Sequence, residues 1–87
     1  MATHRSAMKR ARQNIVRRKR NRSIRTRVKN VIKQVRLAIQ EGSEESARAA
    51  LARAIPVIDK AAGKGVIHKR TASRKISRLA RQVNALE

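Results

Sequence analysis

The sequence lacks cysteine and aromatic residues entirely, and its 87 residues include only one proline and three glycines. Without cysteine the chain can form no disulfide and has no thiol for redox chemistry or for a zinc finger. The absence of Phe, Tyr and Trp removes the side chains on which most single-stranded RNA readers stack splayed bases. Among nucleic acids, this favours folded or double-stranded forms, which are bound through phosphates and sugars.

Acidic residues are also scarce, with 5 Asp and Glu against 24 Lys and Arg, a net charge of +19. The first carboxylate is Glu41, so residues 1–40 contain 14 basic residues and no acid. A charge of this size indicates a polyanionic partner. No apolar run approaches the roughly 20 residues of a membrane-spanning helix, and the N-terminus lacks the apolar region of a secretory signal. We therefore expect nucleic acid as the partner and no membrane.

The densest basic segment is residues 17–29, in which eight of thirteen residues are cationic and none is acidic. In a helix, Arg18 and Arg22 would lie on one side and Arg20 and Arg27 on another, so positive charge would surround the rod. Like charges at these spacings repel, so we expect the segment to fray alone and to become ordered on a polyanion. A nuclear-localisation run is an alternative, but such runs span only about five to eight residues.

Hydrophobic spacing predicts a long first helix over residues 5–41. No Pro or Gly interrupts this range, and apolar residues recur at steps of three and four from Ile24 to Ile39. Met8, Ala11 and Ile15 are spaced like a stripe further forward. At 1.5 Å per residue the helix would be roughly 50 Å long, more than a small bundle can cover. Its first half is therefore expected to project.

Two shorter helices are predicted over residues 44–62 and 67–86. Gly42 ends the first helix and Ser43 caps the second. Pro56 favours a kink in the second helix, with a helix that stops at Ile55 as the alternative. The turn at residues 63–65 leads into the third helix. Each helix carries an apolar stripe, Ala47, Leu51, Ala54, Ile58 and Ala61 in the second and Ala72, Ile76, Leu79, Val83 and Leu86 in the third.

These patterns together predict an all-α protein, a three-helix bundle with a long, projecting basic N-terminal helix, in which residues 1–87 form a single domain. No strand pattern, repeat or low-complexity linker is seen in the sequence. A domain of this size buries only about two-thirds or less of its unfolded surface, so we expect partner binding to contribute much of its order.

Several short motifs carry a resemblance to a known family. They are Ser6-Ala7-Met8-Lys9-Arg10, Lys19-Arg20-Asn21, Ala38-Ile39-Gln40-Glu41-Gly42, Asp59-Lys60-Ala61-Ala62 and above all Lys64-Gly65-Val66-Ile67-His68-Lys69, followed by Thr71-Ala72-Ser73-Arg74 and Ser77-Arg78-Leu79. With these residues the chain resembles bacterial small-subunit ribosomal protein twenty over nearly its whole length. The resemblance implies a three-helix structural protein, found in bacteria and chloroplasts, that binds small-subunit ribosomal RNA directly and early in assembly.

The charge pattern and the resemblance together give a set of expected RNA-binding residues. They are Arg5, Lys9, Arg10, Arg12, Arg17, Arg18, Lys19, Arg20, Asn21, Arg22, Arg25, Arg27, Lys29, Lys64, His68, Lys69, Arg70, Arg74 and Arg78. The contact at His68 is implied by the family motif. Arg70 departs from that motif, in which Asn commonly follows Ile-His-Lys, but a guanidinium can still bind phosphate bidentately.

Other functions have weaker support in the sequence. A DNA-compacting nucleoid or linker-histone-like protein would use similar charge, and a membrane-active basic helix is a further alternative that the lack of Trp and Phe disfavours. The few carboxylates form no plausible catalytic pair, so we expect no enzyme, no catalytic residue and no small-molecule substrate. His4 and His68 lack partners at ligand spacing, so no metal site or cofactor is expected.

The expected setting follows from the resemblance. The chain is expected in the cytoplasm, on the ribosome, with small-subunit ribosomal RNA as its partner and other small-subunit proteins as possible neighbours. A chloroplast source is less favoured, since the chain begins with Met and shows no evident transit peptide. No homo-oligomer is expected.

Overall fold

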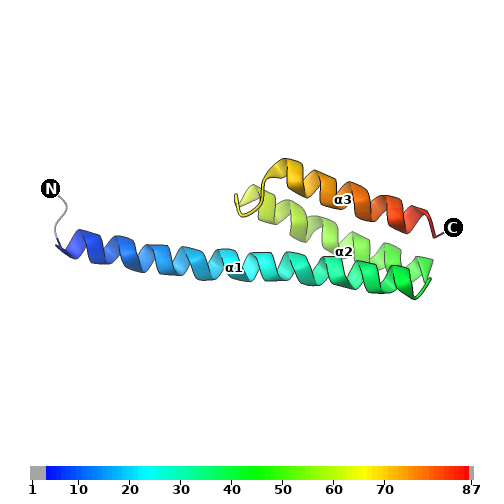
Figure 1. The fold of residues 1–87 in the computed structure, drawn as a ribbon, viewed down its shortest axis with the longest axis horizontal. Helices are drawn as coiled ribbons and strands as arrows, with labels where there is room; N and C mark the ends of the chain where they lie inside the picture. The colour runs from blue at the N-terminus through cyan, green and yellow to red at the C-terminus, as the bar shows by residue number, and fades with distance from the viewer. Residues whose placement is uncertain (1–3, 87) are drawn as a thin grey trace.

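The computed structural model describes residues 4–86, which form three α-helices joined by short turns. Helix α1 spans His4–Gln40, α2 spans Glu44–Gly63 and α3 spans Lys69–Asn84 (Figure 1). The described residues contain no strand. The prediction of an all-α three-helix protein is confirmed.

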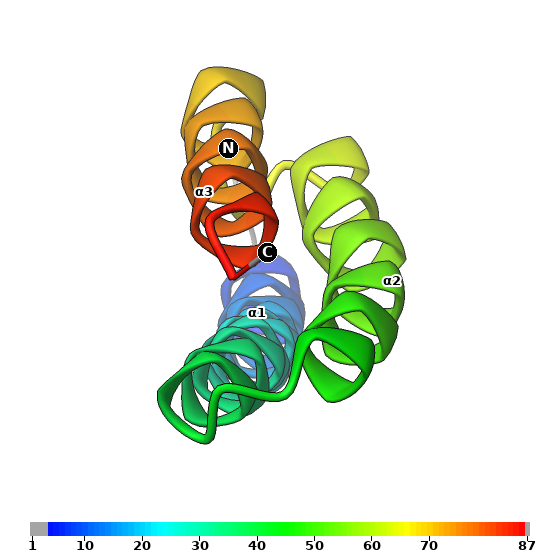
Figure 2. The same cartoon turned by 90° about the vertical axis from the view of Figure 1, so that its right-hand side faces the viewer.

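The molecule is elongated because α1 is much longer than the helices that cover it. Its principal extents are 63 × 21 × 14 Å. Helices α2 and α3 pack along the C-terminal half of α1, and the N-terminal half extends beyond them (Figure 1). Viewed along its length, the bundle brings the three helices side by side (Figure 2). Every described residue before Asn21 is exposed, so residues 4–20 form the projecting rod.

The core lies between the rear of α1 and the two shorter helices. Val35 of α1 and Ile58 of α2 are both fully buried. Alanines 47, 50 and 54 of α2 are buried as well, and such small side chains let neighbouring helices approach closely. The predicted stripes therefore form the core, although some of their members are only partly buried at its edges: Ile24, Val31, Ile39, Leu51, Ile76 and Leu86. Val66, in the turn between α2 and α3, is buried and was missed by the periodicity.

The forward apolar stripe does not join this core. Met8 is 45% exposed and Ile15 is 51% exposed, because both lie on the projecting rod. No element of the described chain covers them. Residues 8–15 are helical, as their spacing predicts, but their apolar side chains do not pack inside the protein.

The turns follow the predicted chemistry, with adjustments at the helix ends. Gly42 has φ +73°, the left-handed conformation that favours glycine after a helix. Ser43 caps α2, its hydroxyl accepting a hydrogen bond from the Ser46 N–H at 3.3 Å. The second left-handed glycine is Gly65, with φ +75°, whereas Gly63 is the last residue of α2.

The helix ends agree with the predictions for α2 and differ for α3. Helix α2 continues through Pro56 to Gly63, close to the predicted range of about 44–62, and the alternative of a helix that stops at Ile55 is wrong. Proline has no N–H, so the carbonyl of Ala52 loses its helical donor. Ala52 and Pro56 are both exposed, so this loss falls on the surface side of α2. Helix α3 begins at Lys69 and ends at Asn84, inside the predicted range 67–86, because His68 has extended backbone angles and serves as the N-cap. The kink at Pro56 stays a prediction.

Candidate nucleic-acid interface

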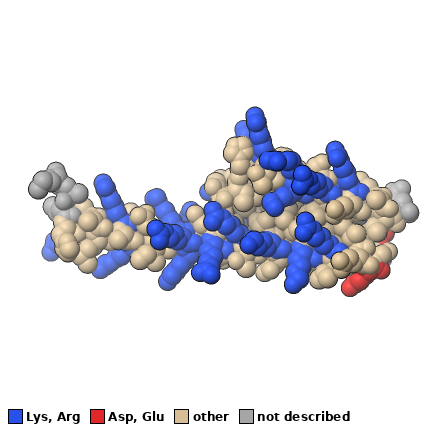
Figure 3. Space-filling view, viewed as in Figure 1, with Lys and Arg blue, Asp and Glu red and all other residues tan. Residues whose placement is uncertain are grey.

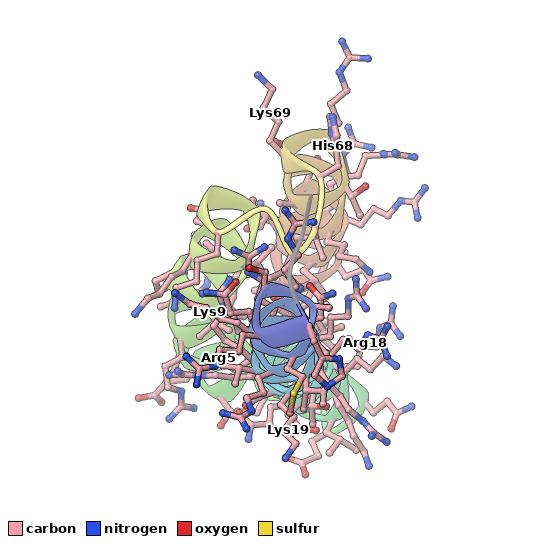
Figure 4. All side chains as sticks on the ribbon, turned by 90° about the vertical axis from the view of Figure 1, so that its left-hand side faces the viewer. Arg5, Lys9, Arg18, Lys19, His68 and Lys69 are labelled. Atoms are coloured by element: carbon pink, nitrogen blue, oxygen red, sulfur yellow. The ribbon has the colours of Figure 1, made fainter. Side chains whose placement is uncertain are left out.

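The projecting rod carries eight of the nineteen expected RNA-binding residues. Its basic side chains are all exposed: Arg5, Lys9, Arg10, Arg12, Arg17, Arg18, Lys19 and Arg20. In a view from the N-terminal end of α1, the labelled side chains of Arg5, Lys9, Arg18 and Lys19 leave the helix in different directions (Figure 4). Positive charge therefore surrounds the rod, and no described acidic residue lies on it. Such a surface suits a partner that offers phosphates on more than one side.

Further cations continue along α1 where the other helices cover it. Arg22, Arg25, Arg27 and Lys29 are exposed although Val28 between them is buried. The helix thus turns its apolar side to the bundle and keeps its charged sides in solvent. Figure 3 shows Lys and Arg side chains along both the rod and the bundle.

A second basic patch lies at the α2–α3 turn and along α3. Its residues Lys64, His68, Lys69, Arg70, Arg74 and Arg78 are all exposed. His68 and Lys69 extend from the beginning of α3 away from α1 (Figure 4). The patch is separate from the projecting rod, so the molecule presents basic surfaces from two elements.

His68 has a structural role that the sequence did not reveal. Its Nδ1 accepts a hydrogen bond from the backbone N–H of Arg70 at 3.1 Å, which caps α3. The ring must therefore be in the state that leaves Nδ1 unprotonated, and a neutral ring then carries its proton on Nε2. Nε2 can donate to a phosphate or ribose oxygen while Nδ1 holds the helix end.

Replacing His68 with Ala and, in a second variant, with Ser should separate the capping role from RNA contact. The free energy of unfolding is expected to fall by about 1 kcal/mol because the cap is lost, and His68→Ser should restore it because a serine hydroxyl can cap in the same way. Urea unfolding of both variants measures this. If the imidazole also contacts RNA, RNA affinity should stay reduced in His68→Ser. Full recovery of affinity with stability would limit His68 to capping.

Asn21 marks the end of the projecting rod and carries an unsatisfied acceptor. Its Oδ1 is shielded from solvent and has no hydrogen-bond partner in the described chain. A buried polar atom without a partner costs free energy. Asn21 is one of the expected RNA-binding residues, and turning its amide toward a bound partner would bring this oxygen within reach of a donor.

Asn21→Ala should therefore affect stability and binding in opposite directions. The free protein should gain stability because the orphan acceptor is gone, whereas RNA affinity should fall about fivefold, the equivalent of one hydrogen bond of about 1 kcal/mol. Asn30→Ala is the matched control, since Asn30 is an exposed asparagine of the same helix. Thermal unfolding and RNA titration of the two variants provide the comparison. Equal behaviour of both variants would contradict a contact at Asn21.

Basic residues outside the expected set also gather in a groove between α1 and α3. It is lined by Lys29, Lys33, Arg36 and Lys75, together with Ile32, Leu37 and Gln40. Only Lys29 was among the predicted residues. The spacing of Lys29, Lys33 and Arg36 by four and three placed them on one helix side and was a usable signal. Their grouping with Lys75 depends on the packing of α3 and could not be read from the sequence.

Three of the acidic residues lie together at one end of the molecule, and Asp59 is exposed on α2. Glu41, Glu44 and Glu45 cluster at the turn between α1 and α2, which Figure 3 shows as a red end of the molecule, and Glu87 is outside the described residues. Glu44 is already paired, with its Oε1 2.8 Å from the Arg48 guanidinium. The charge is therefore polarised along the long axis, from a basic rod to an acidic tip.

Two kinds of site are absent from the part of the chain that the structure describes. Residues 4–86 contain no group of three or more His, Asp or Glu placed to hold a metal ion. Within the same residues, no helix is both long enough and apolar enough to cross a bilayer.

Fold and surface together define a class: small, helical, strongly basic proteins with an exposed cationic helix. Comparison with known proteins identifies the family within that class. The family "Ribosomal protein S20" matches residues 2–84. Small ribosomal subunit protein bS20 of Nitratidesulfovibrio vulgaris strain DP4 is 57% identical over 84 residues, covering 97% of each chain. The bS20 protein of Syntrophus aciditrophicus is 60% identical over 85 residues, covering 98% of this chain and 96% of its own. The chain belongs to the ribosomal protein S20 family, and the resemblance seen in the sequence is confirmed.

Proposed function

We propose that the chain is a structural constituent of the small ribosomal subunit, located on the ribosome in the cytoplasm, that binds small-subunit ribosomal RNA directly and stabilises the RNA fold during assembly. The observation that carries the proposal is the projecting rod, a basic and acid-free helix exposed on all sides. Its relatives bear the name of small ribosomal subunit proteins, which supports the same setting. The protein acts by binding, without catalysis.

The mechanism follows from electrostatics. Phosphates of neighbouring RNA segments repel one another, and a cationic helix placed between them reduces that repulsion. Each phosphate neutralised releases condensed counterions, which supplies much of the binding free energy. The bundle holds the rear of α1 in place, and the basic patch on α3 adds a second contact. Neighbouring ribosomal proteins are expected near the surfaces that RNA leaves free.

The test is binding of the full chain to small-subunit ribosomal RNA over a range of salt concentrations. Log K should fall steeply with log salt, by about 0.7 to 0.9 for each phosphate neutralised. Endogenous protein should also sediment with small subunits in a gradient. A slope near zero would remove the mechanism. Displacement of ribosomal RNA by an equal nucleotide concentration of duplex DNA would favour the DNA-compacting alternative.

A further inference from the structure

A groove between α1 and α2 shares Arg27 and Lys64 with the basic surfaces described above. Its volume is about 620 Å³, within the range of about 300 to 1,000 Å³ that small-ligand sites occupy. Ile24 and Val31 of α1 and Val57 of α2 give it an apolar floor, and all three are only partly buried. The bundle therefore leaves an apolar surface open along this groove.

The rim of the groove is cationic. Arg27 lies on the α1 side, and Arg53, Lys60 and Lys64 lie on the α2 side. No carboxylate is among the residues that line it. Charge complementarity therefore requires an anionic occupant, and the floor requires that the occupant also present an apolar face.

Pro56 adds a hydrogen-bond acceptor to the α2 wall. In an α-helix the carbonyl of residue 52 accepts from the N–H of residue 56, and proline has none. Ala52 and Pro56 both line the groove and both are exposed. The Ala52 carbonyl is thus without its helical partner at the groove wall. Gln34 of α1 also lines the groove, with an amide that can donate and accept.

We propose that this groove receives one unpaired nucleotide extruded from the bound RNA. A nucleotide combines the required features: a phosphate for the cationic rim, a base whose flat face can lie on the apolar floor, and polar base edges for the Ala52 carbonyl and Gln34. The guanidinium groups of Arg27 and Arg53 can stack on a base where aromatic side chains are absent. The proposal rests on the proposed RNA-binding function and adds a site for a single base.

Position on the molecule supports this occupant. Ile24 and Arg27 belong to the basic segment 17–29, so the groove opens directly beside the surface expected to bind phosphates. Asn21, with its unsatisfied Oδ1, lies one turn before Ile24 on the same side of α1. A backbone tracking along α1 would therefore pass the mouth of the groove.

The test uses the full chain and three short RNA duplexes that differ at one position: fully paired, carrying one bulged adenosine, and carrying an abasic residue in place of that adenosine. The bulged adenosine should bind about fivefold tighter than the other two, the equivalent of one net hydrogen bond. Equal affinity for all three duplexes would overturn the groove proposal and leave RNA binding intact. Absence of binding to all three, with small-subunit ribosomal RNA still bound, would also overturn the groove proposal. Absence of binding to that RNA as well would overturn the proposed function.

Two matched variants place the preference in the groove. Ala52→Glu puts a carboxylate at the groove wall, whereas Ala49→Glu makes the same charge change at another exposed alanine of α2 that does not line the groove. The preference for the bulged adenosine should be lost in Ala52→Glu and kept in Ala49→Glu. Ala52→Leu, which fills the groove without a charge, should lose it too. Circular dichroism checks that all three fold, and preference retained in Ala52→Leu would contradict the site.

Discussion

Val35→Asp is expected to unfold the bundle. Val35 is fully buried, and no buried polar or charged side chain in residues 4–86 could partner a carboxylate there. An unpaired carboxylate in such a site costs several kcal/mol, while a domain of this size holds only about 3 to 5 kcal/mol of stability. Far-UV circular dichroism and urea titration should show loss of the cooperative unfolding transition.

Leu37→Asp provides the matched control. It makes the same charge change two residues away on α1, but Leu37 is 47% exposed. The new carboxylate can stay hydrated, so the free energy of unfolding should fall by less than about 1 kcal/mol. If the two variants unfolded at the same urea concentration, the assignment of Val35 to the core would be wrong.

The fold could be predicted from the sequence because its signals are local. The steps of three and four from Ile24 to Ile39 placed the rear of α1 on the core, and Gly42 with Ser43 marked the first reversal. The projecting rod could be predicted because the first helix is much longer than the two helices that pack against it. These inferences need only the 3.6-residue period and the chemistry of helix ends.

Features that depend on the path of the chain between helices escaped this reasoning. Val66 lies in the α2–α3 turn, outside any helical stripe, and is nevertheless buried. The turn is closed by the Val66 N–H, which donates to the Ala61 carbonyl. His68 looked like the first turn of a helix, whereas its extended backbone makes it the cap. A cap of this kind depends on a contact with the Arg70 N–H, which no periodicity encodes.

The candidate interface was predictable in its charge and less so in its shape. The exposed cations of the rod could be identified because a run without acidic residues has no carboxylate nearby to pair with. Its Lys and Arg side chains therefore stay in solvent. Arg53 and Lys60 were not, although they line the α1–α2 groove with Arg27. A groove forms where side chains of two helices face each other. The residues that line it therefore depend on the angle at which the helices pack, which neither helix sequence gives alone. Whether the rod frays without RNA stays a prediction.

Removal of Arg18 and Arg22 should produce the largest loss of RNA binding among simple charge deletions. Both guanidinium groups are exposed, four residues apart on α1, and neither packs in the core. Their double replacement by Ala should lower affinity for small-subunit ribosomal RNA about thirtyfold, at about 1 kcal/mol for each phosphate contact. The slope of log K against log salt should become shallower by roughly 1.4 to 1.8.

The decisive comparison is with Arg48→Glu, which also lowers the net charge by two units. Arg48 lies near the acidic tip and pairs with Glu44, far along the chain from the rod. If affinity depends on contacts along α1 rather than on total charge, Arg48→Glu should leave both affinity and salt slope nearly unchanged. Circular dichroism should show that both variants stay folded. Equal losses in the two variants would mean that the RNA senses only the net charge, and the basic side chains of α1 would lose their special role.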